Sequence, residues 1–232
     1  MTDRLIFLSG VATSTDFMEP IRDVLVSRLE SAGRAPLVSM LMPYGDWSRR
    51  LLAQLNEVRQ DLPWRLRRTG HGLTDANGRA GLLAAELGAV HEAGDTIALI
   101  GHSAGGVLAV QTAAHLERIG VEGTRIVQIG SPKVPIPAPL RDRTLYIYPT
   151  GPNGRIPDPI VRLGSWGGWR RGRYGGPLWN SRQHAPCHIV ALPLIGGHAD
   201  YFRTREPYRN ETGQTNLSLT EAAIWQFINP IN

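Results

Sequence analysis

The stretch TIALIGHSAGGVLAV, residues 96–110, constrains the fold more than any other part of this sequence of 232 residues. An apolar run with the length of a buried strand passes through G-H-S-A-G into a run with helical spacing. Ser103 adds nothing to packing there, and the glycines beside it would weaken a strand or a helix. They are useful if Ser103 stands on a turn too tight for ordinary side chains. We therefore predict a strand, a sharp turn that displays Ser103, and a helix.

Short apolar runs alternate with longer helical patterns along the chain, which is typical of a mainly parallel sheet flanked by helices. The predicted strands span 4–10, 35–43, 96–101, 125–130, 144–149 and 188–195. The predicted helices begin near residue 17 and span, further along, 47–62, 79–94, 105–120 and 218–228. No repeat or linker divides the sequence. We predict one α/β domain over residues 1–232.

Two of these helices carry capping signals. Thr15 or Asp16 is expected to cap the first helix. Ser218 and Glu221 have the spacing of a capping box at the start of the last one.

Composition excludes several classes of protein. The hydrophobic fraction of 42% and the charged fraction of 19% are ordinary for a globular chain. No apolar run approaches the ~20 residues that cross a bilayer, and the first apolar run is expected to be a buried strand rather than a signal peptide. The single cysteine, Cys187, excludes an internal disulfide and fits a reducing compartment. We expect a cytoplasmic protein.

The net charge is +5, and every basic residue except Lys133 and the histidines is an arginine. Arginines cluster with aromatic residues at WRLRR (64–68) and WRRGRY (169–174). No nucleic-acid-binding module accompanies these clusters, so we expect no nucleic-acid partner. Weak contact with an anionic membrane surface fits them better.

A long segment rich in glycine and tryptophan spans residues 164–181. Segments of this length without regular structure are usually functional or mobile. One interpretation is a mobile flap in which Trp166 and Trp169 form part of a substrate pocket. The other is a surface loop whose tryptophans simply pack on the edge of the sheet.

A serine displayed on such a turn is suited to nucleophilic catalysis. Its hydroxyl needs a base, which in turn needs an acid to orient it. The backbone N–H of Ala104, at the start of the helix, is placed to bind an oxyanion. The serine turn at a strand's end also predicts where its partners lie, because parallel strands end at one rim of the sheet.

His198 is the preferred base, because it lies in GGHADYF just beyond the last predicted strand. The other six histidines lie in helices, in other loops, at the start of that strand, or beside Ser103 itself: His71, His91, His102, His115, His184 and His188. Asp158 is the preferred acid, because it follows the predicted strand 144–149. The alternatives are Glu117 and Glu122, on or just past the serine's helix, Asp142, at the wrong end of a strand, and Asp200, two residues after His198, from where it rarely reaches the ring.

The order Ser103, Asp158, His198, together with the G-x-S-x-G turn, resembles that of the α/β-hydrolase superfamily, and the resemblance covers essentially the whole chain. It implies a compact α/β-hydrolase fold and a second oxyanion donor after the first strand, at Val11 or Ala12. GSPKVP (130–135) and DPIVR (158–162) are similar to segments of class 3 lipases, and GHADYF to histidine loops of lipase-like hydrolases.

The resemblance implies a serine esterase or lipase-like enzyme acting on a small-molecule or lipid ester. A thioesterase, an amidase or an acyltransferase has the same triad, and a catalytically silent binding module has the same fold. No cofactor is expected, because the sequence has no metal-ligand cluster and no phosphate-binding fingerprint.

Overall fold

The computed structural model describes residues 2–11, 13–45, 78–173 and 175–229. In the described part of the chain the order of helices, strands and short 3-10 turns (η) is β1 (Asp3–Leu8), α1 (Glu19–Ser31), β2 (Leu37–Leu41), α4 (Arg79–Ala89), β3 (Thr96–His102), α5 (Ala104–Arg118), β4 (Arg125–Ile129), η2 (Ala138–Leu140), β5 (Thr144–Pro149), η3 (Pro152–Gly154), η4 (Ile160–Arg162), β6 (Gly168–Arg171), β7 (Pro177–Asn180), β8 (His188–Leu192) and α6 (Asn216–Ile228). The predicted helix 47–62 and the basic cluster 64–68 lie outside the described residues.

Six of these strands form one parallel sheet in the order β2-β1-β3-β4-β5-β8. Each predicted strand is found, which confirms the prediction of a mainly parallel α/β sheet. Neighbouring parallel strands need crossover connections. Helix α1 connects β1 to β2 and α5 connects β3 to β4, whereas the connections from β4 to β5 and from β5 to β8 carry the short turns η2, η3 and η4. The carboxyl ends of the strands therefore meet along one rim.

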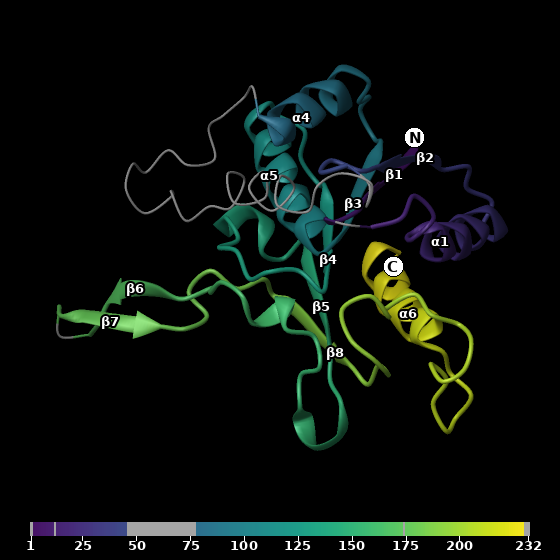
Figure 1. The fold of residues 1–232 in the computed structure, drawn as a ribbon. Coiled ribbons are helices and arrows are strands. Elements are labelled where there is room, and N and C mark those ends of the chain that lie inside the picture. The colour runs from purple at the N-terminus through teal and green to yellow at the C-terminus, as the bar shows by residue number, and fades with distance from the viewer. Residues whose placement is uncertain (1, 12, 46–77, 174, 230–232) are drawn as a thin grey trace.

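Helices cover both faces of this sheet: α4 and α5 lie on one side, and α1 and α6 on the other (Figure 1). Strand β1 shows how the sequence achieves this. Leu5 and Phe7 pack into the core under α1 and α6, while Ile6 and Leu8 pack into the core under α4 and α5. Because side chains alternate along a strand, a strand that is buried on both faces appears as a continuous apolar run.

The start of α1 differs from the prediction. The helix begins at Glu19 after Met18, which makes no side-chain capping bond, so neither Thr15 nor Asp16 is the cap. Residues 15–18 form a turn instead. Pro20 stands in the first turn of the helix, where its missing N–H costs nothing and its fixed φ favours helix.

The start of α6 also differs. The capping box is formed by Thr215 and Ser218, three residues before the predicted pair. Glu221 instead pairs with Arg28 of α1, at 3.0 Å between Oε1 and Nε. That ion pair ties α6 to α1 on the same face of the sheet.

The segment 164–181 is not wholly irregular. It contains an antiparallel hairpin of β6 and β7 that forms a separate two-stranded sheet. In the described part of the chain no helix is long and apolar enough to cross a membrane.

Candidate active site

Ser103 stands alone between β3 and α5. Its backbone has φ 56° and ψ −126°, a conformation that a residue with a side chain rarely adopts. Its N–H donates a hydrogen bond to the carbonyl of Ile129 in the neighbouring strand β4, at 2.9 Å. The turn predicted from G-H-S-A-G is therefore present, and it is fixed to the sheet.

Three glycines, which have no side chain, make this turn possible. A Cβ on Gly101 would meet the backbone of Gly105, and a Cβ on Gly105 would meet the carbonyl of Leu8. A Cβ on Gly10, after β1, would lie 2.6 Å from the Cβ of Ser103. Glycine is required at these positions because backbone or side-chain atoms already occupy the space.

The first helical residue, Ala104, lies at the N-terminus of a helix of 15 residues. Backbone N–H groups in a first helical turn have no intrahelical partner, and the helix dipole favours negative charge there. Val11 packs in one small cluster with Ala104 and Tyr44. Of the two predicted positions for a second oxyanion donor, Val11 thus lies beside Ala104, whereas Ala12 lies outside the described residues.

His198 follows β8 in a loop and makes a hydrogen bond with Asp158. The distance from His198 Nδ1 to Asp158 Oδ2 is 2.9 Å. The side chain of Asp158 is fully buried, whereas that of His198 is 28% exposed. Because Asp158 holds Nδ1, the second imidazole nitrogen, Nε2, is the one that can take part in proton transfer.

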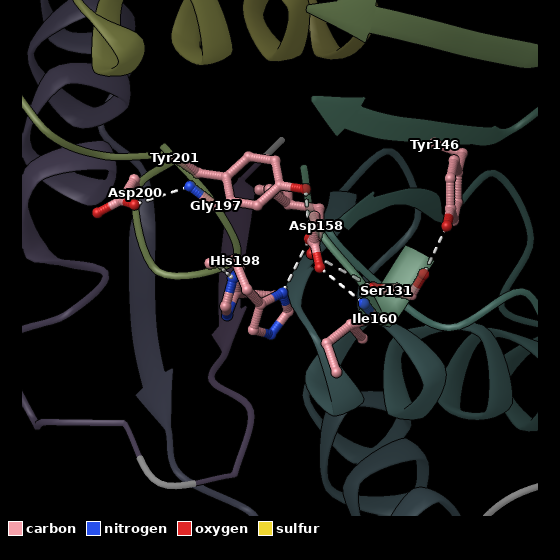
Figure 2. A network of polar contacts seen from close by, with 10 residues as sticks. Ser131, Tyr146, Asp158, Ile160, Gly197, His198, Asp200 and Tyr201 are labelled. Carbon is pink, nitrogen blue, oxygen red and sulfur yellow. Dashed lines mark hydrogen bonds and ion pairs between the residues drawn. The ribbon is translucent and has the colours of Figure 1, made fainter. Parts of the chain in front are cut away.

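Asp158 accepts two further hydrogen bonds, which Figure 2 shows converging on its carboxylate. Tyr201 donates its hydroxyl to Oδ2 and Ile160 its backbone N–H to Oδ1, each at 2.8 Å. Burial alone would raise the pKa of Asp158, but the hydrogen bonds and charge interaction with His198, and the bonds from Tyr201 and Ile160, lower it below its ordinary value. Asp158 is therefore a buried carboxylate that stays ionised.

His102, the residue before Ser103, supports the base from the other side. Its Nε2 lies 3.0 Å from the backbone carbonyl oxygen of His198, and the two imidazole centroids are 4.7 Å apart. Burial, and then the nearby His198, lower the pKa of His102 to about 3. His102 is thus neutral at ordinary pH.

The contributions of His102 and Tyr201 are absent from the sequence-based prediction. Tyr201 lies three residues after His198 in the same quoted segment, GHADYF. The position of His102 beside Ser103 is a second signal in the sequence. Neither signal reveals a partner, because His102 bonds a backbone carbonyl and Tyr201 bonds a residue 43 positions away.

Among the hydrogen bonds of the described residues, none joins an alternative acid to His198, and Glu122 is exposed. Glu117 pairs with Arg143 at 2.8 Å. Asp142 is exposed, and its backbone carbonyl lies 3.0 Å from Nε2 of His188. Asp200 accepts a hydrogen bond from the N–H of Gly197 within its own loop, at 2.8 Å.

The structure joins His198 to Asp158 and places both beside the Ser103 turn through His102. The hydrogen bonds of the described residues include none between Ser103 Oγ and the ring of His198. Catalytic hydrogen bonds are often long without substrate and tighten when it binds. The described residues also hold no group of three or more His, Cys, Asp or Glu side chains suited to a metal ion.

The two predicted pocket tryptophans lie in different surroundings. Trp166 is 8% exposed and packs edge-on against Tyr146, with 4.8 Å between the ring centroids. The ammonium of Lys133 lies 5.4 Å from the Trp166 ring centroid. Trp169 is 61% exposed on β6.

Comparison with known proteins agrees with the parallel sheet and its flanking helices. The model of the alpha/beta hydrolase family matches residues 12–225, which is most of the chain. A search of curated proteins found no match. The strand order, the serine turn and the matched length together lead to one conclusion: this chain belongs to the alpha/beta hydrolase family.

Proposed function

We propose that the protein is a serine hydrolase that cleaves carboxylic esters through an acyl-enzyme. The observation that carries this proposal is the hydrogen bond between His198 Nδ1 and the buried, ionised Asp158, beside a serine on a strained turn. A base that is oriented by an acid next to a displayed hydroxyl is the arrangement that nucleophilic catalysis needs.

In the proposed reaction, Oγ of Ser103 attacks the ester carbonyl while Nε2 of His198 takes the hydroxyl proton. Asp158 holds Nδ1–H of His198, so that the unprotonated nitrogen faces the serine and the resulting imidazolium is stabilised. The C–O bond of the ester then breaks, and His198 returns the proton to the leaving alcohol. Water, activated by the same base, adds to the acyl-enzyme and releases the acid together with free Ser103.

The negative charge on the carbonyl oxygen needs donors that are already in place. We assign these to the N–H of Ala104 and to an N–H at Val11 or Ala12. One such donor contributes roughly 3 kcal/mol of transition-state stabilisation. The start of α5 at Ala104 supports the first assignment, and the packing of Val11 near Ala104 supports the second.

The acyl group of the substrate is proposed to contact the segment around Trp166 and Trp169. The same triad would also serve a thioesterase, an amidase or an acyltransferase, because it does not select the leaving group or the acceptor. An ester is preferred to an amide because an alkoxide is a better leaving group than an amide anion and needs less help from the protonated base.

The experiment that tests the function is labelling with a fluorophosphonate, which reacts with activated serines. We expect the protein to be labelled at Ser103 and to hydrolyse p-nitrophenyl esters, and we expect Ser103→Ala to lose both properties. A correctly folded protein that neither reacts with the probe nor cleaves any ester would instead be a silent binding module. Labelling that persists in Ser103→Ala would assign the nucleophile elsewhere.

A further inference from the structure

The hairpin of β6 and β7 extends from the rest of the molecule. Figure 1 shows it projecting away from the parallel sheet, on the side opposite α1 and α6. Its two strands pair with each other in a sheet of their own. An isolated two-stranded hairpin is marginally stable in water, because neither face is covered.

Large apolar side chains are exposed on both faces of this hairpin. Trp169 and Trp179 are directly opposite and meet edge to face, with centroids 5.4 Å apart. They are 61% and 46% exposed. Leu178 is the next residue along β7, so it points to the other face, where it pairs with Arg170 and is 46% exposed. A partner that covers all three apolar side chains must surround the hairpin rather than cover one side.

The charge around these side chains has one sign. Arg170, Arg171 and Arg173 are exposed on β6 and the turn that follows it. The sequence has no Asp or Glu between Asp158 and Asp200. The hairpin is therefore an apolar projection flanked by positive charge without any acidic residue to neutralise it.

The base of the hairpin is fixed to the body of the protein. The N–H of His184 donates to the carbonyl of Trp166 at 2.8 Å, and the N–H of Ser165 donates to the carbonyl of Lys133 at 3.1 Å. The ring of Trp166 packs on Tyr146. These contacts attach both ends of the hairpin to the body of the protein.

The Trp166 anchor also lies close to the candidate active site. Tyr146, on which Trp166 packs, donates its hydroxyl to the carbonyl of Ser131. Figure 2 shows Ser131 beside Asp158, the residue that orients His198. The base of the hairpin is therefore connected to the candidate site through Trp166, Tyr146 and Ser131.

We propose that the β6–β7 hairpin docks the protein on an anionic lipid surface. Tryptophan prefers the boundary between lipid headgroups and acyl chains, and arginines beside it are attracted to anionic headgroups. A lipid boundary closes around an inserted projection, which matches the exposure of apolar groups on both faces. A nucleic acid would stack on one aromatic face, and the edge-to-face contact of Trp169 with Trp179 leaves no shared flat platform for bases.

The test is sedimentation of the full chain with phosphatidylcholine vesicles and with vesicles of equal parts phosphatidylcholine and phosphatidylglycerol. We expect binding to the anionic vesicles only, and weaker binding as salt rises. The triple variant Arg170→Gln, Arg171→Gln, Arg173→Gln should bind on the order of a hundredfold more weakly, since each arginine near the surface contributes about fivefold. The double variant Trp169→Ala, Trp179→Ala should also bind weakly and lose the blue shift of tryptophan fluorescence on vesicles.

The matched control is Arg155→Gln, Arg205→Gln, Arg209→Gln, which removes three exposed arginines outside the hairpin. This control should bind anionic vesicles nearly as well as the wild type. Equal weakening by both triple variants, or equal binding to both kinds of vesicle, would overturn the proposal. So would tighter binding to single-stranded RNA than to vesicles, or a dimer in solution that only the tryptophan variant abolishes.

The docking proposal stands independently of the proposed chemistry. Ser103→Ala should bind anionic vesicles like the wild type. The triple arginine variant should keep the wild-type rate on a short, water-soluble ester, because Arg170, Arg171 and Arg173 are exposed on the hairpin and have no part in the proposed chemistry. Loss of vesicle binding with intact labelling, or the reverse, therefore separates a failure of docking from a failure of the chemistry.

Discussion

His102 donates a hydrogen bond from Nε2 to the backbone carbonyl oxygen of His198, across 3.0 Å. A carbonyl oxygen only accepts, so the proton must be on Nε2 and the neutral ring has one tautomer. The two rings are also in contact, with 4.7 Å between their centroids. His102 therefore holds the backbone of the base, while Asp158 holds its ring.

This relationship predicts a contrast between two substitutions of His102. Glutamine places an amide N–H near the position of Nε2 and should retain most of the activity. Leucine fills the space but donates no hydrogen bond, so the His198 loop should shift and kcat should fall on the order of tenfold or more, with KM little changed. Steady-state kinetics on a soluble ester measures both. Equal activity of His102→Leu and His102→Gln would show that the hydrogen bond does not position His198.

The burial of His102 predicts an acid-dependent loss of stability. Its pKa is about 3 in the folded protein and near 6.5 in the unfolded chain. Between these values the unfolded chain binds the extra proton, so this residue's contribution to stability falls as pH decreases through that window. The limiting slope is about 1.4 kcal/mol per pH unit for one group. Urea unfolding between pH 7 and pH 4 should show a shallower decline for His102→Leu than for the wild type. An equal decline of the free energy of unfolding in both proteins would contradict this role of His102.

Asp158 and Asp142 offer a matched pair of substitutions, because only Asp158 bonds His198. Asp158→Asn should lower kcat roughly 10⁴-fold, since an asparagine in this position favours the wrong tautomer of the imidazole. Asp142→Asn, at an exposed site, should leave kcat unchanged. The reverse result would assign the acid to Asp142.

The backbone of Ser103 predicts an unusual effect of glycine. At φ 56° and ψ −126° any side chain is strained. Ser103→Gly should therefore be more stable than Ser103→Ala by about 1 kcal/mol, and the preference for glycine over alanine at an N-cap acts in the same direction. Thermal unfolding of the two inactive variants makes the comparison. A more stable alanine variant would show that the turn carries no strain.

Trp166 and Trp169 should respond differently to truncation. Trp166 is buried on Tyr146, so Trp166→Ala should lower the free energy of unfolding by about 4 kcal/mol. Trp169 is mostly exposed, so Trp169→Ala should leave stability nearly intact. If Trp169 contacts the acyl chain, its loss should change the ratio of kcat/KM between short and medium esters. An unchanged ratio would exclude Trp169 from the acyl pocket.

The parallel sheet was predictable because its strands are buried on both faces and therefore appear as short continuous apolar runs. TIALI is the clearest example, and the glycines after it indicate the turn at Ser103. The hairpin of β6 and β7 was missed for the opposite reason. Its side chains are exposed on both faces and glycines interrupt it, so no alternation of apolar and polar residues marks its strands.

Local capping rules predicted the wrong start for two helices because tertiary contacts and neighbouring residues compete with them. Glu221 fits a capping box by spacing, yet its carboxylate pairs with Arg28 of another helix. In the candidate site, chain order and strand ends were enough to propose Ser103, Asp158 and His198. The pairing of His102 with a carbonyl 96 residues away depends on the folded backbone, which spacing alone does not reveal.

The close packing around the Ser103 turn predicts that neighbouring positions differ in how substitutions harm the protein. Substitutions of the glycines should prevent folding, whereas substitutions of Ser103 should prevent turnover. In a survey of every single substitution scored by cellular abundance, Gly10, Gly101 and Gly105 should be among the least tolerant positions, because any side chain there displaces backbone or Ser103 itself. Ser103 should tolerate small replacements in the same survey and yet be intolerant when turnover is scored. A comparison of the two assays would then separate the glycines, which are needed for folding, from Ser103, which is needed for the reaction, although they are immediate neighbours in space.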